Sequence, residues 1–260
     1  MSNIQANDIA YVQGLALPDA PRRSVTRGGS SRAATEAVQF GSEQEVATIG
    51  AQIAEFSTAV PPAQRAVVAD CLLLAQLAAN KATAMNDDLH AWYEQYLGVL
   101  QKLGWLQTSM DFKATEVDDQ DAGVHTAILP VLTALLGPAA AATSMVVSVL
   151  KGLQEMDQGN PWITIFDRAS SHASGAKFQL GFVDADSDGG MVTVQLVAMA
   201  IDAQRRITQV LFFRFSSDHA KLAVAKSNLS VGADRLQALR QVVADRVAPF
   251  IVENIGKIEL

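Results

Sequence analysis

The chain has few cysteines and few charges. Cys71 is the one cysteine among 260 residues, so no disulfide can form within the chain. Only 18% of the residues are charged, and the net charge is −7. An acidic balance of this size argues against a nucleic-acid partner and gives no overall attraction to anionic lipid. The first residues lack the basic and apolar regions of a secretory signal, so we expect synthesis in the cytoplasm.

Motifs for the common catalytic chemistries are also lacking. The sequence contains no P-loop, no dinucleotide-binding glycine fingerprint, no HExxH and no GxSxG. The histidines have no metal-ligand spacing, and a single cysteine offers no pair. Ser170, Ser171 and His172 are adjacent, and adjacent residues rarely converge as nucleophile and base. We therefore expect no enzyme activity and no cofactor, with an unrecognised active site as the residual alternative.

One stretch does suggest a ligand. Asp184, Asp186 and Asp188 precede Gly189 in the D-x-D-x-D-G order of an EF-hand loop. The twelfth position, however, is Gln195 in place of the bidentate glutamate. The flanking runs alternate or are rich in β-branched residues, which is typical of a β-hairpin. The stretch is therefore either a solvated hairpin tip, the favoured interpretation, or a weak cation site. The acidic loop 117–123 carries the same two alternatives, with an exposed turn favoured.

The first 155 residues are expected to be mainly helical. Residues 1–40 form a flexible segment in this interpretation, with Arg22, Arg23, Arg27 and Arg32 available for docking or activation. Apolar residues at helical spacing predict helices over 43–57 and 62–80, and another helix that follows a cap at Asn86 or Asp87 and ends at Gly104. Cys71 lies on the apolar stripe of the second helix. It is expected to be an inert core thiol, with an acylation site as the alternative.

A long stretch without charge follows at residues 124–150, which contain no Asp, Glu, Lys or Arg. Its length could cross a bilayer, but Pro130 and the Gly137–Pro138 pair would break one continuous helix. We expect two apolar helices, over roughly 124–136 and 138–155. They form either a buried layer of the fold or a membrane-seeking surface.

Strands are expected from residue 160 onward. Runs typical of strands cover 175–184, 189–203 and 206–216, and 219–231 is expected to be a further edge strand that Lys221 and Lys226 protect from pairing. Segregated helices and strands predict an α+β fold. The expected organisation is one domain over 41–260, with a helical part (43–155), a β-meander (160–231) and a C-terminal helix (233–253) kinked at Pro249.

The C-terminal part resembles the Cyt family of cytolytic δ-endotoxins over about residues 140–230. The resemblance depends on four features in order: the apolar helix TSMVVSVLKGLQEM, the segment WITIFDRASSHAS, the hairpin AKFQLGFVDADSDGGMVTVQLVAMAIDA, and QVLFFRFSSDHAKLAV with VLFF in the closing strand. In the N-terminal part, WYEQYLGVLQKLGW looks more like bacterial virulence proteins called Evf, which are similar to Cyt toxins in fold.

This resemblance implies a layered α/β domain in which helical hairpins wrap an antiparallel sheet. It further implies an insecticidal cytolysin or virulence protein, made in a bacterial cytoplasm and then released or delivered to its target. Such a protein binds lipid, opens, and assembles as a homo-oligomer that permeabilises the membrane. A non-lytic lipid- or acyl-binding protein, or the cargo of an injection machine, is the alternative. The residues expected to contact the membrane are Ile128, Leu129, Val131, Leu132, Leu135, Leu136, Val192, Val194, Leu196, Leu211, Phe212 and Phe213.

Two features depart from the resemblance. Arg214 lies inside the VLFFRFSS run, where a charge facing lipid near the midplane would cost about 2–4 kcal/mol. It must therefore face a lumen, a partner or water. Evf-like proteins carry an acyl group on a cysteine in their C-terminal half, whereas Cys71 lies in an N-terminal helix. Acylation therefore cannot be transferred to Cys71 by position.

Overall fold

The computed structural model describes residues 3–21, 38–84, 88–108, 110–115, 117, 121–203, 205–215 and 220–259. Within these residues nine strands form one sheet, in the order β3-β8-β7-β6-β2-β1-β9, with β4 also paired to β8 and β5 to β6. The strands are β1 (Glu45–Ile49), β2 (Gln52–Phe56), β3 (Leu106–Gln107), β4 (Lys113–Thr115), β5 (Ser171–His172), β6 (Gly175–Ala185), β7 (Met191–Asp202), β8 (Lys221–Gly232) and β9 (Ile255–Ile258).

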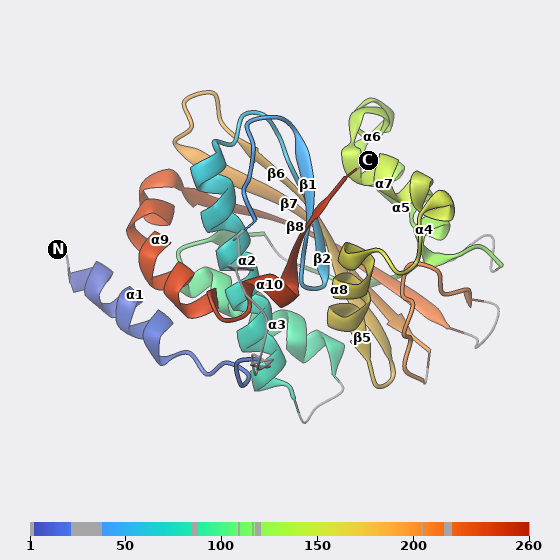
Figure 1. Cartoon of the computed structure of the whole chain (residues 1–260), viewed down its shortest axis with the longest axis horizontal. Coiled ribbons are helices and arrows are strands. Elements are labelled where there is room, and N and C mark those ends of the chain that lie inside the picture. The colour runs from blue at the N-terminus through green and yellow to red at the C-terminus, as the bar shows by residue number, and fades with distance from the viewer. Residues whose placement is uncertain are drawn as a thin grey trace, which may run out of the picture.

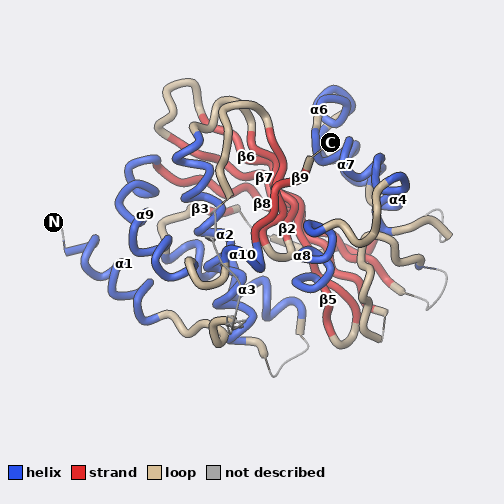
Figure 2. The backbone as a smooth tube through the Cα atoms, viewed as in Figure 1, coloured by secondary structure: helices blue, strands red, loops and turns tan. Residues whose placement is uncertain are grey.

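Helices cover both faces of this sheet (Figures 1 and 2). One face packs against α2 (Pro62–Ala82), α3 (Leu89–Lys102) and α9 (Ala233–Val247), with α1 (Asn3–Gly14) against α9. The other face carries α4 (Val124–Ala127), α5 (Leu129–Leu136), α6 (Pro138–Thr143), α7 (Met145–Gly152), the 3₁₀ turn η1 (Leu153–Glu155) and α8 (Pro161–Ser170). The short α10 (Ile251–Asn254) leads into β9. The predicted α+β content and layered α/β architecture are therefore confirmed.

The long hairpin β6–β7 is the centre of the sheet. Its register runs from Gly175 opposite Asp202 to Ala185 opposite Val192. Gly189, with φ of 65°, supplies the left-handed residue of the tip, as the Asp-rich stretch predicts. β8 continues the antiparallel pairing beside β7. The pair β2–β6 is parallel, so the sheet is mixed and not purely antiparallel.

The helix predicted over 43–57 is wrong, because this segment forms the hairpin β1–β2. Gly50, with φ of 55°, makes the turn between Ile49 and Gln52. All residues of both strands are buried, since helices cover both faces of the sheet here. Strands buried on both faces need not alternate apolar and polar residues, so their apolar positions matched a helical spacing by coincidence.

The predicted meander over 160–231 needs two corrections. Its start is helix α8, in which the Asn160 side chain accepts a hydrogen bond from the Trp162 amide (3.4 Å) and Pro161 occupies the first turn. Residues 206–215 form turns and no strand. Their apolar side chains are buried one by one against the helical layer, and β8 occupies the position beside β7. The strand predicted over 219–231 is therefore present, although the short β3 and β4 pair with its outer edge.

The two ends of the chain also differ from prediction. Residues 3–14 form helix α1, with Val12 buried and Asp8 paired to Arg235 on α9. The predicted basic segment, with its four arginines, lies outside the described residues, as do Asn86 and Asp87. Asp88 caps α3 in their place.

The C-terminal helix ends at Val247, the predicted break at Pro249 is confirmed, and β9 follows.

Asp70 on α2 is partly buried beside an apolar cavity of about 280 Å³ between α2 and α9. Burial raises the pKa of its carboxyl from 3.8 to about 7. The folded chain therefore binds more protons than the unfolded chain between pH 3.8 and about 7. The contribution of Asp70 to stability falls as the pH rises through that window, so the ionised carboxylate destabilises the fold at neutral pH.

We expect Asp70→Asn to raise the free energy of unfolding at pH 8 by about 2 kcal/mol, after allowance for partial exposure. At pH 4 the two proteins should differ little, because the carboxyl is then neutral in the folded chain. Urea unfolding at both pH values measures the difference. Asp245→Asn, an exposed position at the same cavity, should change stability by less than about 0.5 kcal/mol. A gain from Asp70→Asn that is equal at both pH values would contradict the burial argument.

Candidate membrane-contact surface

The uncharged stretch 124–150 folds into four short helices. Gly137, with φ of 82°, ends α5, and Pro138 begins α6, so the predicted Gly–Pro corner is confirmed. Another break separates α4 from α5 beside Pro130, and a third break, before α7, was not predicted. Ser144 caps α7 by accepting a hydrogen bond from the Val147 amide (3.3 Å). Within the described residues, no helix combines the length and apolarity needed to cross a bilayer.

Leu129 to Thr143, here named the α5–α6 corner, packs against the protein on one side only. Leu132 is fully buried, and Ile128 just before the corner is buried with it. Leu129, Val131, Leu135 and Leu136 are half-buried. Most of α6 is exposed, and it projects from the body of the molecule in Figure 1. The corner is therefore an apolar, charge-free surface that remains partly in contact with water.

A buried carboxylate attaches this helical layer to the sheet. Glu55 on β2 accepts hydrogen bonds at Oε2 from the Ser144 hydroxyl (2.7 Å) and the Val146 amide (3.0 Å). Its Oε1 accepts one from Gln44 Nε2 (2.6 Å). A negative charge at the N-terminus of a helix is stabilised by the unpaired amides there. Glu55 thus holds α7 in place, and nothing in the local sequence predicted this.

The loop 207–215 provides a second attachment. The Val124 amide donates to Phe213 O, and the His125 amide donates to Leu211 O, both at 2.9 Å. His125 Nδ1 also donates to Leu211 O (2.7 Å). Asp167 on α8 accepts a hydrogen bond from the Val210 amide (2.8 Å), and burial raises the pKa of this carboxyl to about 6. The loop therefore connects α4 to α8, which both belong to the helical layer on this face of the sheet.

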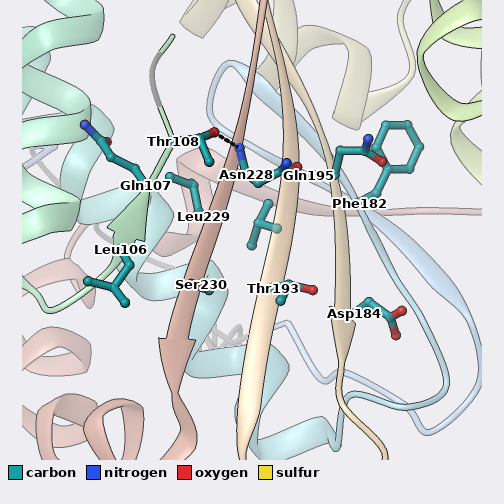
Figure 3. A pocket seen from close by; sticks show the side chains of 11 residues that line it. Leu106, Gln107, Thr108, Phe182, Asp184, Thr193, Gln195, Asn228, Leu229 and Ser230 are labelled. Carbon is teal, nitrogen blue, oxygen red and sulfur yellow. Dashed lines mark hydrogen bonds between the residues drawn. The ribbon is translucent and has the colours of Figure 1, made fainter.

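An open groove separates the corner from the outer strands. A cavity of about 700 Å³, here named the α5 groove, lies between Val131, Ala134 and Leu135 of α5 and strands β4 and β8. It adjoins a second cavity of about 570 Å³ on the sheet, and Thr108 and Asn228 line both. Figure 3 shows the side chains that line the second cavity, which come mainly from β3, β6, β7 and β8.

This second surface carries two rows of side chains, which are polar except for Phe182. Phe182, Gln195 and Asn228 are opposite one another across three strands. Asp184, Thr193 and Ser230 form the next row. None of these six residues is fully buried, because the helical layer does not extend over this end of the sheet. We name these six residues the polar platform.

The structure divides the residues predicted to contact membrane between two faces of the sheet. The residues on α4 and α5 lie with Leu211, Phe212 and Phe213 on one face, where the His125 and Phe212 rings are 5.5 Å apart. Val192, Val194 and Leu196 are fully buried on the opposite face, beneath α2 and α9. The even-numbered residues of β7 face α2 and α9, whereas its odd-numbered residues, such as Val197 and Met199, face the helical layer.

The Asp-rich tip uses its carboxylates within the turn. Asp184 accepts hydrogen bonds from Ser57 Oγ (2.6 Å) and the Ala185 amide (2.9 Å), and Asp186 accepts one from the Met191 amide (3.1 Å). Asp188 accepts one from Ser187 Oγ (3.4 Å). Across the described part of the chain, no group of three or more His, Cys, Asp or Glu side chains is placed to hold a metal ion. In the second acidic loop, Asp118 and Asp119 lie outside the described residues.

Cys71 is fully buried in α2. Burial, with the nearby Asp70 carboxylate, raises the pKa of its thiol to about 12. The thiolate is the reactive form, so this cysteine is protonated and inert at neutral pH in this conformation. Acylation of Cys71 therefore needs a movement of α2, and it stays a hypothesis.

Comparison with known proteins was made by sequence and by structure. No family model matches the chain, and no curated protein matches it in sequence. Among solved structures, a δ-endotoxin aligns at 17% identity over 69% of this chain and 80% of its own, with a TM-score of 0.39. Activated Cyt2Ba monomer from Bacillus thuringiensis subsp. israelensis aligns at 15% identity over 69% of this chain and 95% of its own, with a TM-score of 0.38. These values record a remote similarity and do not assign a family.

Proposed function

We propose that the protein binds lipid membranes through the α5–α6 corner and disrupts them when its helical layer separates from the sheet. The observation that carries this proposal is the corner itself: charge-free, apolar, projecting and partly exposed. Large exposed apolar patches on soluble domains mark protein or membrane interaction sites. A membrane is favoured because the surrounding stretch 124–150 also lacks the charged residues that form the rim of a protein interface.

Initial binding needs only modest energy. Completing the burial of a leucine or valine that is already mostly buried is worth less than about 1 kcal/mol. The four partly exposed side chains of the corner therefore supply at most a few kcal/mol, which is less than a single lipid anchor contributes and is reversible. Firm attachment needs more apolar surface. The face of the sheet beneath the helical layer provides it.

Opening would expose that surface. Phe178, Leu180, Val197 and Met199 line the sheet under the helical layer and are fully buried in the closed form. The layer is built from helices of four to ten residues, and short helices depend on tertiary packing for their stability. Lipid could replace that packing. Assembly into a homo-oligomer on the membrane belongs to the same proposal.

A dye-release assay with liposomes tests the proposal on the full chain. We expect binding and leakage, and we expect Leu136→Asp to weaken vesicle binding at least about tenfold, because a carboxylate in the apolar region costs about 2.5–3.5 kcal/mol. Val252→Asp is the matched control, since Val252 is an apolar residue with 57% exposure on α10, away from the corner. Its binding should be unchanged.

Failure of the full chain to bind or permeabilise any lipid mixture would remove the proposed function. Binding without leakage would favour a non-lytic lipid-binding protein.

A further inference from the structure

The α5 groove combines an apolar wall with positive charge. Val131, Ala134 and Leu135 line its helical side, and Lys113 and Lys226 line its strand side. Both lysines are exposed, and within the described part of the chain neither forms an ion pair. Asp111 is the one acidic residue among the described residues that line the groove. The groove is therefore locally basic in a chain whose net charge is −7.

The order of the side chains along β8 gives the groove a direction. Val224, Lys226, Asn228 and Ser230 point to the same face, with every second residue advancing by about 6.6–6.8 Å. Val224 is beneath α5, Lys226 follows, and Asn228 and Ser230 belong to the polar platform. Apolar, basic and hydrogen-bonding surfaces thus follow one another along a continuous path of about 20 Å.

The polar platform is suited to hydroxyl groups. Gln195 and Asn228 offer amide donors and acceptors, Thr193 and Ser230 offer hydroxyls, and Asp184 adds a carboxylate at the far edge. Phe182 contributes an aromatic ring beside Gln195 (Figure 3). The side chain of Asn228 is exposed, while its backbone amide is held by Thr108 Oγ1 at 2.9 Å. The backbone is therefore fixed, and the side chain is available to a ligand.

We propose that this path binds one anionic phospholipid whose headgroup carries several hydroxyls, of the phosphatidylinositol class. The phosphate contacts Lys226 and Lys113, the hydroxylated ring lies on the polar platform, and an acyl chain follows α5. Asp184 disfavours additional negative charge at the far end, which selects hydroxyls there over a second phosphate. This inference rests on the proposed membrane binding and adds a lipid preference to it.

Sedimentation with vesicles tests the inference on the full chain. Three mixtures are compared: phosphatidylcholine alone, and phosphatidylcholine with an equal minor fraction of phosphatidylinositol or phosphatidylserine. The two anionic lipids carry the same net charge, so a difference between them reports the headgroup. We expect phosphatidylinositol to give the tightest binding, by about three- to tenfold over phosphatidylserine, the effect of one or two hydrogen bonds.

Three variants separate the contributions. Lys226→Gln should weaken binding to both anionic mixtures by about fivefold and leave phosphatidylcholine binding unchanged. Lys221→Gln removes the same charge from the same strand but from the opposite face, and should change binding to each mixture by less than about twofold. Asn228→Ala should abolish the preference for phosphatidylinositol over phosphatidylserine. Circular dichroism and thermal melts establish that each variant is folded.

The outcomes distinguish this inference from the proposed function. If the wild-type chain binds all three mixtures equally, or if Lys226→Gln and Lys221→Gln behave alike, the groove does not select this lipid, while membrane binding by the corner stands. If Asn228→Ala keeps the full preference, the platform does not hold the headgroup and the inference is overturned. If no mixture binds the wild-type chain, the proposed function itself fails.

Discussion

Replacing Arg65 with methionine is expected to lower the free energy of unfolding by about 3–5 kcal/mol. Arg65 on α2 is fully buried, and its guanidinium donates to the Glu45 carboxylate at 2.5 Å. The same group donates to four backbone carbonyls, at Ser42 (3.2 Å), Glu43 (2.6 Å), Ser57 (2.8 Å) and Val60 (2.7 Å). Methionine fills a similar volume but removes all of these hydrogen bonds, of which those to Glu45 and Val60 are buried. It also leaves the Glu45 carboxylate without its buried cationic partner.

Urea unfolding at neutral pH measures this effect. Arg168→Met is the matched control, because its ion pair with Glu253 is half-exposed on both sides. Exposed pairs contribute about 0–1 kcal/mol. Arg65→Lys should be intermediate, because lysine restores the charge but not the planar fork of donors that reaches carbonyls on both sides. A loss below about 1 kcal/mol for Arg65→Met would show that water or a backbone shift satisfies the carbonyls, and the stabilising role assigned to the Arg65 hydrogen bonds would be wrong.

The β6–β7 hairpin could be predicted because its signals are local. Asp186 and Gly189 make the tip, and the flanking runs have strand character. The Gly137 break and the turn at Pro249 were equally readable, because glycine and proline act on the backbone where they stand. For such elements, the pattern of neighbouring residues contains the physical cause of the structure.

The β1–β2 hairpin and the loop 207–215 could not be predicted in this way. β1 and β2 are strands because β6 and β9 pair with them, and those partners are far away in sequence. The run VLFF has strand propensity, yet Leu211 and Phe213 fill gaps between α4, α8 and the sheet. Tertiary packing overrode local preference in both segments. The VLFF strand, one of the four features of the resemblance, is therefore absent.

The candidate site was predictable only in part. The apolar, charge-free stretch is visible in the sequence, and its helices form the α5–α6 corner. The α5 groove and the polar platform are not visible, since they join α5 to β4, β7 and β8 across long separations. Glu55 was missed for the same reason. An acidic residue in an apolar run resembles an exposed position of the helix predicted over 43–57 until α7 is placed against it.

Replacing Glu55 with glutamine is expected to loosen the α4–α7 layer by about 2–4 kcal/mol and to accelerate liposome leakage by tenfold or more. The two side chains have nearly the same shape, so packing is retained. The carboxylate, however, accepts from Ser144, Val146 and Gln44 with both of its oxygens. A glutamine in the same position loses the negative charge that strengthens these hydrogen bonds. Its NH₂ group must also face either the buried Ser144 and Val146 donors or Gln44, whose amide would then have to turn over.

Hydrogen exchange by mass spectrometry and dye release test this prediction together. We expect faster exchange in α5–α7 (residues 129–152), little change in α2 and α3 on the opposite face, and faster leakage at equal vesicle binding. Glu43→Gln is the control, because its side chain is exposed and only its backbone carbonyl contacts Arg65. If exchange in α5–α7 rises while leakage does not, separation of this layer is not the step that permeabilises the membrane. If neither changes, Glu55 does not hold the layer, and the closed form must be maintained by the loop 207–215 and by apolar contacts such as those of Leu132 and Leu150.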